Sequence, residues 1–395
     1  MTDTDGTVGT VVFGPHLLYR ILAWEDHPQP FRKSLKSAAR VSRDVALAVY
    51  LGKRALFLGI TLVVATYMVV VIANQGGLID RILIAEIRIS TAQELGNQQW
   101  YQRLDASEKQ RVYNETVQQR IHNRGLDQPF LSKSFRQTWE ALTLDFGQAQ
   151  GTYGTGSFKL TTIIMERLPR TVILFTTATA LSAVIGVWLG LRMARRALSV
   201  FDRSLTVLSI TTLVIPSWVL GIFFILMFSV GLRLFPTGGM VSAPAPREPF
   251  ALLGDQLWHL LLPLITVTFA NFGAWSYTTR NLVLQIMAED FVNAARSKGL
   301  PEKIVLRRYV LRAASPPIMT GIILALVASW TGAIITEIVF NWPGLGLLFF
   351  EAVTNTDAPT IIALTIIFAY LFVVTVLLLD FAYGLLDPRI RALGR

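Results

Sequence analysis

Cysteine is absent from the 395 residues of the chain, and charged residues are scarce, at 16% of the sequence where about a quarter is usual. Without cysteine the chain can form no disulfide, no thiolate nucleophile and no cysteine-ligated metal centre. The four histidines, at positions 16, 27, 122 and 259, are scattered, whereas a metal site needs a cluster of ligands. We therefore expect no metal site in this chain.

The sequence motifs of common enzymes are also missing. There is no G-x-x-x-x-G-K-[ST] phosphate loop, because Gly52–Lys53–Arg54 lacks both the preceding spacing and the hydroxyl. There is no H-E-x-x-H zinc motif and no G-x-S-x-G nucleophile elbow. We therefore expect no catalytic residue and no cofactor in this chain. Energy for any work against a gradient must come from ions or from a partner, and the lack of repeated acidic residues in the apolar runs favours a partner.

Six long runs with little or no charge dominate the sequence. Each has about 19 residues or more, enough at about 1.5 Å per residue to cross roughly 30 Å of hydrocarbon. The runs are 55–73, 171–191, 204–232, 256–279, 313–336 and 358–379. Buried helices of a soluble enzyme would not explain six of them. The sequence predicts an all-α integral membrane protein with six transmembrane helices.

Positive charge gathers beside these runs and gives the chain a net charge of +10. Arginine and lysine cluster in the N-terminal tail, between the second and third runs, in the loop 281–316 and at the C-terminus, whereas 337–357 has neither. Because cationic loops stay on the cytoplasmic side, we predict a multi-pass protein of the cell (inner) membrane with both termini in the cytoplasm. The excess charge then serves topology and contact with membrane lipid, not binding of nucleic acid.

The predicted spans divide the chain into five parts. These are a cytoplasmic N-terminal tail with an amphipathic helix (1–54), transmembrane helix 1 (55–74), an extracytoplasmic helical insert (75–168), a core of spans 2–6 that includes the cytoplasmic loop 281–316 (169–385), and a cytoplasmic tail (386–395). The pattern of 31–50 fits a helix on the inner membrane surface and equally a helix that continues into the first span. A first apolar run behind a long cationic tail is typical of an uncleaved anchor.

One stretch of the insert carries the signals of a helix. Asp105 or Ser107 suits its N-cap, and Gly125 suits its end. Apolar residues spaced along it are Val112, Val117 and Ile121. We predict a small helical outer domain.

Several polar residues lie within or beside the predicted spans, where they are either functional or satisfied by hydrogen bonds between helices. They are His259, Asn271, Glu337, Asn341 and Asp380. Pro216 and Pro263 lie in the middle of spans, and Pro316–Pro317 opens the fifth. Proline bends a helix, and such bends serve either gating or static packing.

The segment 290–300 reads DFVNAARSKGL, and the basic stretch RRYVLRAASPPI follows it. Small residues at Ala294 and Ala295 and a turn at Gly299 would let a short helix lie close against another protein. The segment resembles the EAA loop of ABC-importer permeases, in the version carried by the dipeptide and oligopeptide family. Asn293 stands where that motif has glutamate, which is a departure at a contact position.

Further stretches resemble the same family, in its order, from about residue 120 onward. They are GLDQPF, LDFG, ERLPRTVILF, IPSWVLG, EIVFNWPGLGLL and DFAYGLLDPRIR. Two features depart from the family. The N-terminal tail is longer, and IANQGGLID replaces the usual proline–glycine–aspartate after the first span.

The resemblance implies the permease subunit of an ATP-driven importer. Its expected partners are a homologous second permease subunit, two cytosolic ABC ATPase subunits, which would bind ATP and magnesium, and an extracytoplasmic solute-binding protein. The expected cargo is a short peptide, delivered by the binding protein. Similar permeases carry nickel chelates or oligosaccharides, and a passive channel or membrane scaffold is the alternative from another class.

The resemblance also assigns roles to residues. Those expected to couple to the ATPase are Asp290, Asn293, Ala294, Ala295, Gly299 and Leu300. Those expected at the translocation path or its outer gate are Asn271, Glu337, Pro343, Gly344 and Gly346. We expect the glycines of the PGLG sequence to adopt positive φ, in a turn that either reaches toward the path or simply connects two helices. In the closing motif, Asp387 and Arg389 are expected to form a cytosolic pair.

Overall fold

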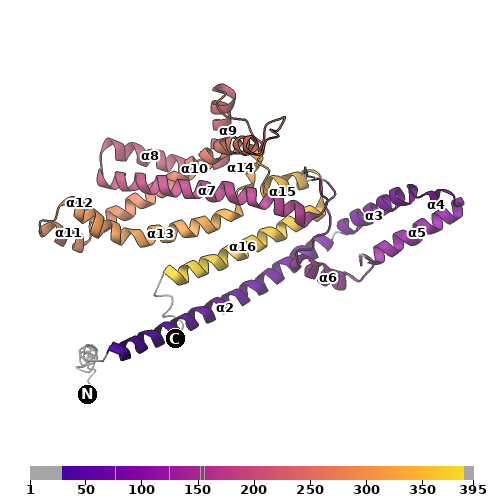
Figure 1. Ribbon diagram of the computed structural model, residues 1–395, viewed down its shortest axis with the longest axis horizontal. Coiled ribbons are helices and arrows are strands. Elements are labelled where there is room, and N and C mark those ends of the chain that lie inside the picture. The colour runs from indigo at the N-terminus through magenta and orange to yellow at the C-terminus, as the bar shows by residue number, and fades with distance from the viewer. Residues whose placement is uncertain (1–28, 76, 124, 152, 155, 387–395) are drawn as a thin grey trace, which may run out of the picture.

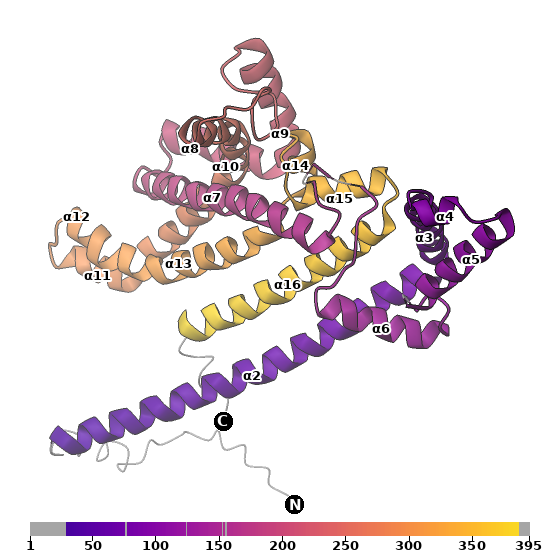
Figure 2. The same cartoon turned by 45° about the vertical axis from the view of Figure 1, so that its right-hand side comes forward.

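Long helices make up most of the structure, a computed structural model that describes residues 29–386 except positions 76, 124, 152 and 155. Some of them gather in one bundle (Figure 1), namely α7 (Leu160–Arg195), α8 (Val200–Val214), α10 (Pro249–Met287) and α13 (Leu311–Ala328). α16 (Ala358–Leu386) lies between this bundle and α2 (Gln29–Gln75), as Figure 2 shows.

Among the described residues, five helices are long and apolar enough to cross a membrane, and a sixth span exists if one bent pair counts as a span. The five are Val49–Gln75, Leu160–Arg195, Pro249–Met287, Glu302–Ala328 and Ala358–Ala382. Large apolar side chains on them are exposed, Ile72 by 71% and Val184 by 67%. Such surfaces suit lipid rather than water. The prediction of an all-α integral membrane protein is confirmed.

The third span is broken at its proline. α8 is followed by α9 (Ser217–Phe224) and a π-helical segment, η1 (Ile225–Gly231), and the two halves meet at 104°. Pro216 has no N–H to donate, and it holds Ile215 in an extended conformation, at φ −83° and ψ 119°. The bend expected there is therefore a full break, and α9 projects from the bundle (Figure 1). Pro263, by contrast, stays inside the continuous helix α10.

Two helix ends differ from the apolar runs read in the sequence. α7 already begins at Leu160, so the last residues of the predicted insert belong to the second-span helix. The fifth run extends to 336, whereas α13 ends at Ala328. A 3-10 turn, η3 (Ser329–Thr331), and Gly332 at φ +65° then redirect the chain into α14 (Ile334–Val339). Glycine reaches this positive φ without a steric penalty.

The first and last spans are joined by an ion pair. α2 is one continuous helix, which agrees with the alternative in which the helix of 31–50 continues into the first span. Arg54 Nε on α2 lies 2.6 Å from a carboxylate oxygen of Asp380 on α16. Of the two roles considered for Asp380, a functional one and a contact between helices, the structure shows the contact between helices. The pair expected between Asp387 and Arg389 lies outside the described residues.

The insert forms a group of helices around the far end of α2 (Figure 1). They are α3 (Leu78–Gly96), α4 (Gln99–Gln102), α5 (Ala106–Asn123) and α6 (Phe130–Leu142). The helix predicted after Asp105 is confirmed as α5, and Gly125, at φ +64°, follows its end. Val117 and Ile121 of α5 are buried against Ile87 of α3.

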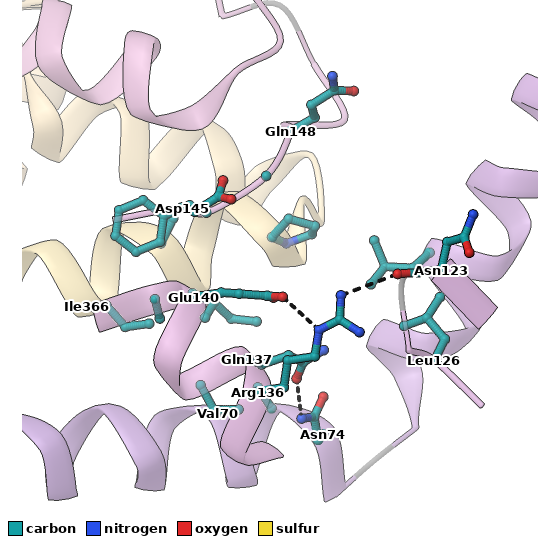
Figure 3. Close-up of a pocket in the computed structure, with 18 residues that line it drawn as sticks. Val70, Asn74, Asn123, Leu126, Arg136, Gln137, Glu140, Asp145, Gln148 and Ile366 are labelled. Carbon is teal, nitrogen blue, oxygen red and sulfur yellow. Dashed lines mark hydrogen bonds and ion pairs between the residues drawn. The ribbon is translucent and has the colours of Figure 1, made fainter. Parts of the chain in front are cut away.

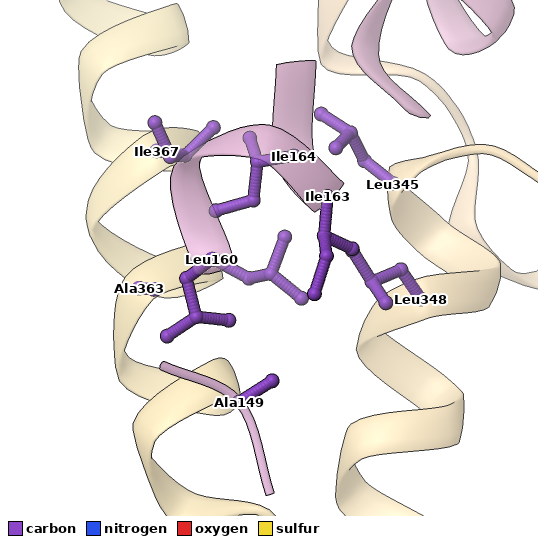
Figure 4. Close-up of a cluster of buried hydrophobic side chains, with 9 residues drawn as sticks. Ala149, Leu160, Ile163, Ile164, Leu345, Leu348, Ala363 and Ile367 are labelled. Atoms are coloured by element: carbon purple, nitrogen blue, oxygen red, sulfur yellow. The ribbon is translucent and has the colours of Figure 1, made fainter. Parts of the chain in front are cut away.

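An apolar cluster packs the N-terminal end of α7 against α16 and α15 (Leu345–Thr354), as Figure 4 shows. Its buried members are Ala149, Leu160, Ile163, Ile164, Leu345, Leu348, Ala363, Leu364 and Ile367. Because side chains from three helices interlock here, the short helix α15 is held at a fixed place beside the second span.

Closely packed glycines hold α7 against α10. Gly186 and Gly190 are four residues apart on α7, the small-xxx-small spacing that lets membrane helices approach closely. A Cβ on Gly186 would lie 2.6 Å from the carbonyl oxygen of Phe272, and one on Gly190 would lie 2.5 Å from that of Ser276. Ser276 Oγ also lies 2.7 Å from Ser209 Oγ on α8. The centre of the bundle therefore depends on the absence of side chains at these positions.

We expect Gly190→Ala to destabilise the chain by about 1–3 kcal/mol, because the added methyl group would press two backbones apart. Gly59→Ala on α2 is the matched control, since nothing lies within 4 Å of a Cβ built there. Melting of both variants in detergent, followed by size-exclusion recovery after heating, measures the difference. Equal melting temperatures would contradict the close packing of α7 on α10.

Candidate functional site

The helix predicted for coupling is present as α11 (Asp290–Ser297), at the end of the bundle where α10 stops. α12 (Glu302–Ile304) and the π-helical segment η2 (Val305–Val310) return the chain to α13. In Figure 1 the short helices α11 and α12 project beyond the ends of the long helices.

One side of α11 is anchored in the chain itself. Val292 and Ala295, three residues apart, are 0% and 3% exposed. They belong to a buried apolar cluster whose other members are Ala194 of α7, Val283 of α10, Val305 and Val310 of η2 and Ala314 of α13. Helix α11 is therefore packed directly against the ends of three spans, α7, α10 and α13, and is not merely connected to them by a loop.

The other side of α11 is open. Asp290, Asn293 and Ala294 are exposed, and Leu300 is half-buried. Ala295, which the motif groups with Ala294, faces inward, so its small size serves packing within the chain. Of the two alanines, Ala294 is the one available to a partner.

Gly299 ends the helix through its conformation. Its φ is +73°, and nothing lies within 4 Å of a Cβ built on it, so the turn and not crowding requires glycine. Arg296 closes the turn by donating to both oxygens of Glu302, at 3.2 and 2.9 Å. The hydrogen bond from Arg296 to Glu302 raises the pKa of the guanidinium.

A second ion pair joins the start of α8 to α10 and was missed in the sequence. Asp202, at the start of α8, accepts hydrogen bonds from Arg280 Nε and a terminal guanidinium nitrogen, at 2.5 and 2.7 Å, and is only 1% exposed. Ser199 Oγ accepts from the backbone N–H of Asp202 at 3.2 Å and so caps α8. The Ser-x-x-Asp spacing is the signal that could have revealed this ion pair.

Two of the residues expected at the gate, Gly344 and Gly346, lie against Glu337, whose side chain is buried between α14, α15 and α7. Thr171 Oγ donates to Glu337 Oε1 at 2.7 Å. The backbone N–H groups of Gly346 and Leu347 donate to Oε2 at 2.7 and 3.1 Å. These N–H groups open α15, so the carboxylate lies at the positive end of a helix dipole. Leu345 N–H completes the cluster by donating to Thr171 Oγ at 2.8 Å.

The expectation that the PGLG glycines adopt positive φ is wrong. Gly344 has φ −101°, and Gly346 lies within α15. Both positions require glycine because neighbouring atoms leave no room for a side chain. A Cβ on Gly344 would meet the carboxylate of Glu337, and one on Gly346 would lie 2.6 Å from Cα of Ile334. The glycines are therefore needed for close approach to α14, and Pro343 leads the chain into this contact.

Asn271 occupies a separate place. It is exposed on α10, and its amide donates to the carbonyl oxygen of Val267 one turn earlier on the same helix, at 2.9 Å. His259 is buried on α10, with Nδ1 2.8 Å from the carbonyl oxygen of Asp255. Both side chains satisfy polar groups within their own helix.

Both candidate sites, apart from Thr171, fall within a region that matches a known family model. Residues 186–392 match the binding-protein-dependent transport system inner membrane component. The chain belongs to this family. It is a multi-pass membrane protein and a permease component of a transport system, which confirms the resemblance read from 290–300.

Individual relatives cover most of the chain. The oligopeptide transport system permease protein AppB of Bacillus subtilis is 33% identical over 69% of this chain and 84% of its own length. The inner membrane ABC transporter permease protein YejB of Escherichia coli O157:H7 is 30% identical over 71% of this chain and 77% of its own. The oligopeptide transport system permease protein OppB of Mycobacterium tuberculosis is 30% identical, over 70% and 85%.

We expect Glu337→Ala to lower the free energy of unfolding by about 2–6 kcal/mol, because each of two buried N–H groups left unpaired costs about 1–3 kcal/mol. Glu337→Gln retains an oxygen that can accept from these groups and should lose much less. Thermal melting in detergent separates the two variants. If both melt like the unmodified chain, the carboxylate does not hold α15 in place.

Proposed function

We propose that this chain is the permease subunit through which an ATP-driven importer passes short peptides into the cell. The names of its relatives, which include oligopeptide permeases from distant bacteria, support peptides over nickel chelates or oligosaccharides. Membership in a binding-protein-dependent family argues against a passive channel or a scaffold.

The observation that carries the proposal is the two-sided character of α11. Asn293 and Ala294 are exposed, while Val292 and Ala295 are buried against the ends of the spans. A partner that moves the exposed side must move the buried side with it, because the cluster is closely packed. Such a helix transmits force, whereas a free loop would absorb it.

The partners follow from this arrangement and from the family. Two cytosolic ABC ATPase subunits would bind ATP and magnesium, with α11 of this chain seated on one and the corresponding helix of a homologous permease on the other. A solute-binding protein outside would deliver the peptide. The chain itself would hold no cofactor.

In this mechanism ATP binding closes the ATPase subunits and draws the two coupling helices together. The cluster around Val292 passes the movement to α7, α10 and α13. The ion pair between Arg280 and Asp202 passes the movement on to α8, since Asp202 lies in the first turn of that helix. The spans then open outward, and hydrolysis resets them.

We also propose that both termini and α11 lie in the cytoplasm and that the Glu337 cluster lies at the outer ends of the spans. There Glu337, Gly344 and Gly346 would shape the outer gate by fixing α15, with Pro343 directing the chain into it. Asn271, exposed on α10, would line the path directly.

Ala294→Arg should reduce the ATPase activity that co-purifies with the chain by about tenfold or more, equivalent to about 1.4 kcal/mol of lost binding. A long charged side chain at that exposed position would block close approach of a partner. The amount of chain in the membrane should stay unchanged, because Ala294 packs against nothing in the cluster.

Ala197→Arg is the matched control, an exposed alanine in the neighbouring connection between α7 and α8. It should leave the co-purifying ATPase activity near that of the unmodified chain. An equal loss in both variants, or none in Ala294→Arg, would remove α11 from the docking contact.

Uptake of labelled di-, tri- and tetra-alanine tests the cargo. Cells from which this chain is deleted should lose uptake of at least one of the three peptides, and the unmodified chain should restore it. Unchanged peptide uptake together with lost uptake of a nickel chelate or an oligosaccharide would contradict peptides as cargo while leaving the docking role intact.

A further inference from the structure

The short helix α6 has an unusual distribution of side chains. Leu131, Phe135 and Trp139, spaced four residues apart along one side, are 61%, 64% and 69% exposed. Its buried residues are Lys133, Ser134, Thr138 and Ala141. A helix at the surface of a water-soluble domain buries its apolar side and exposes its polar one. Helix α6 instead buries mainly polar residues and exposes large apolar ones.

The buried polar side is fully engaged with the rest of the chain. Lys133 Nζ forms an ion pair with Asp80 at the start of α3. Asn74, near the end of α2, donates to Gln137 at 2.6 Å and to Ser134 Oγ at 3.5 Å. These contacts fix how α6 is turned about its axis, so the apolar stripe cannot rotate inward.

A further side of α6 borders a cavity of about 450 Å³, which Figure 3 shows. Arg136 and Glu140 line it and form an ion pair at 2.9 Å, and Arg136 also donates to the carbonyl oxygen of Asn123 at 3.3 Å. The charged residues of α6 therefore lie toward α3 and α5, away from the stripe.

The stripe continues the lipid-facing surface of the first span. The ring of Phe135 lies 5.1 Å from the ring of Tyr67 on α2. Tyr67 lies about 12 Å before Gln75, the last residue of α2, at 1.5 Å per residue. Below Tyr67 on α2, Val63 and Val64 are 46% and 51% exposed. α6 is thus level with part of a membrane span and not above it.

We infer that α6 lies in the outer boundary of the membrane and that the side chains of Leu131, Phe135 and Trp139 contact lipid acyl chains. Tryptophan and tyrosine favour this boundary because one part of each ring system is apolar and another can bond to water or headgroups. Burial of the stripe in lipid removes the conflict between its composition and its exposure. The insert would then be anchored to the bilayer surface through α6 as well as through the spans.

The absence of cysteine makes a direct test simple, because one introduced cysteine gives one labelled site. Leu131→Cys and Trp139→Cys are each given a nitroxide label in the chain reconstituted into liposomes with the subunits that co-purify with it. Accessibility to oxygen, which concentrates in lipid, is compared with accessibility to a water-soluble nickel chelate. Ile72→Cys on α2 is the lipid-facing reference, and Gln118→Cys on the exposed side of α5 is the aqueous one.

Both α6 labels should match the reference at 72, with an oxygen-to-nickel ratio several-fold above that at 118. A ratio equal to that at 118 would place the stripe in water and overturn the inference. Low accessibility to both reagents would mean that a protein partner covers the stripe, which would overturn it as well. Because each labelled side chain is exposed, the substitutions leave the buried contacts of α6 in place, and melting temperature checks this for each variant.

Discussion

In the proposed mechanism, function depends most directly on the contact of Val292 and Ala295 with the ends of the spans. It converts an exposed eight-residue helix into a rigid extension of α7, α10 and α13. The proposed transport cycle needs such a part, since movement generated in a partner subunit would have to reach the spans undiminished. Ala295 contributes by being small enough to bury completely, and Ala294 by being small where a partner would approach.

At the surface of a soluble protein, water satisfies the hydrogen bonds of polar groups. Inside a membrane, other groups of the protein must do so. Two buried carboxylates have partners that satisfy them, Asp202 through Arg280 and Glu337 through Thr171 and the N–H groups that open α15. Because hydrocarbon offers no alternative partner, contacts of this kind fix the helices that they join. Glu337 holds the α14–α15 segment to the second span, and Asp202 joins the third span to the fourth.

Much of the fold follows from composition and periodicity. Apolar runs long enough to span a bilayer predict the membrane-spanning helices, and Gly125 and Gly299 mark helix ends through their positive φ. The break at Pro216 could be expected as a bend but not as a 104° turn, since its size depends on what α9 packs against. The reason for the PGLG glycines could not be read at all, because their neighbours, Glu337 and Ile334, are brought close only by folding. The inward position of Ala295 likewise depends on the ends of other helices.

The most direct test of the central claim is chemical cross-linking from Asn293→Cys, the only thiol in an otherwise cysteine-free chain, to other proteins of intact membranes, with the adduct identified by mass spectrometry. A subunit that hydrolyses ATP should be the main adduct, and its yield should change when ATP is added. An adduct that lacks such a subunit, or one that forms equally well from Ala197→Cys, would contradict the docking of an ATPase on α11.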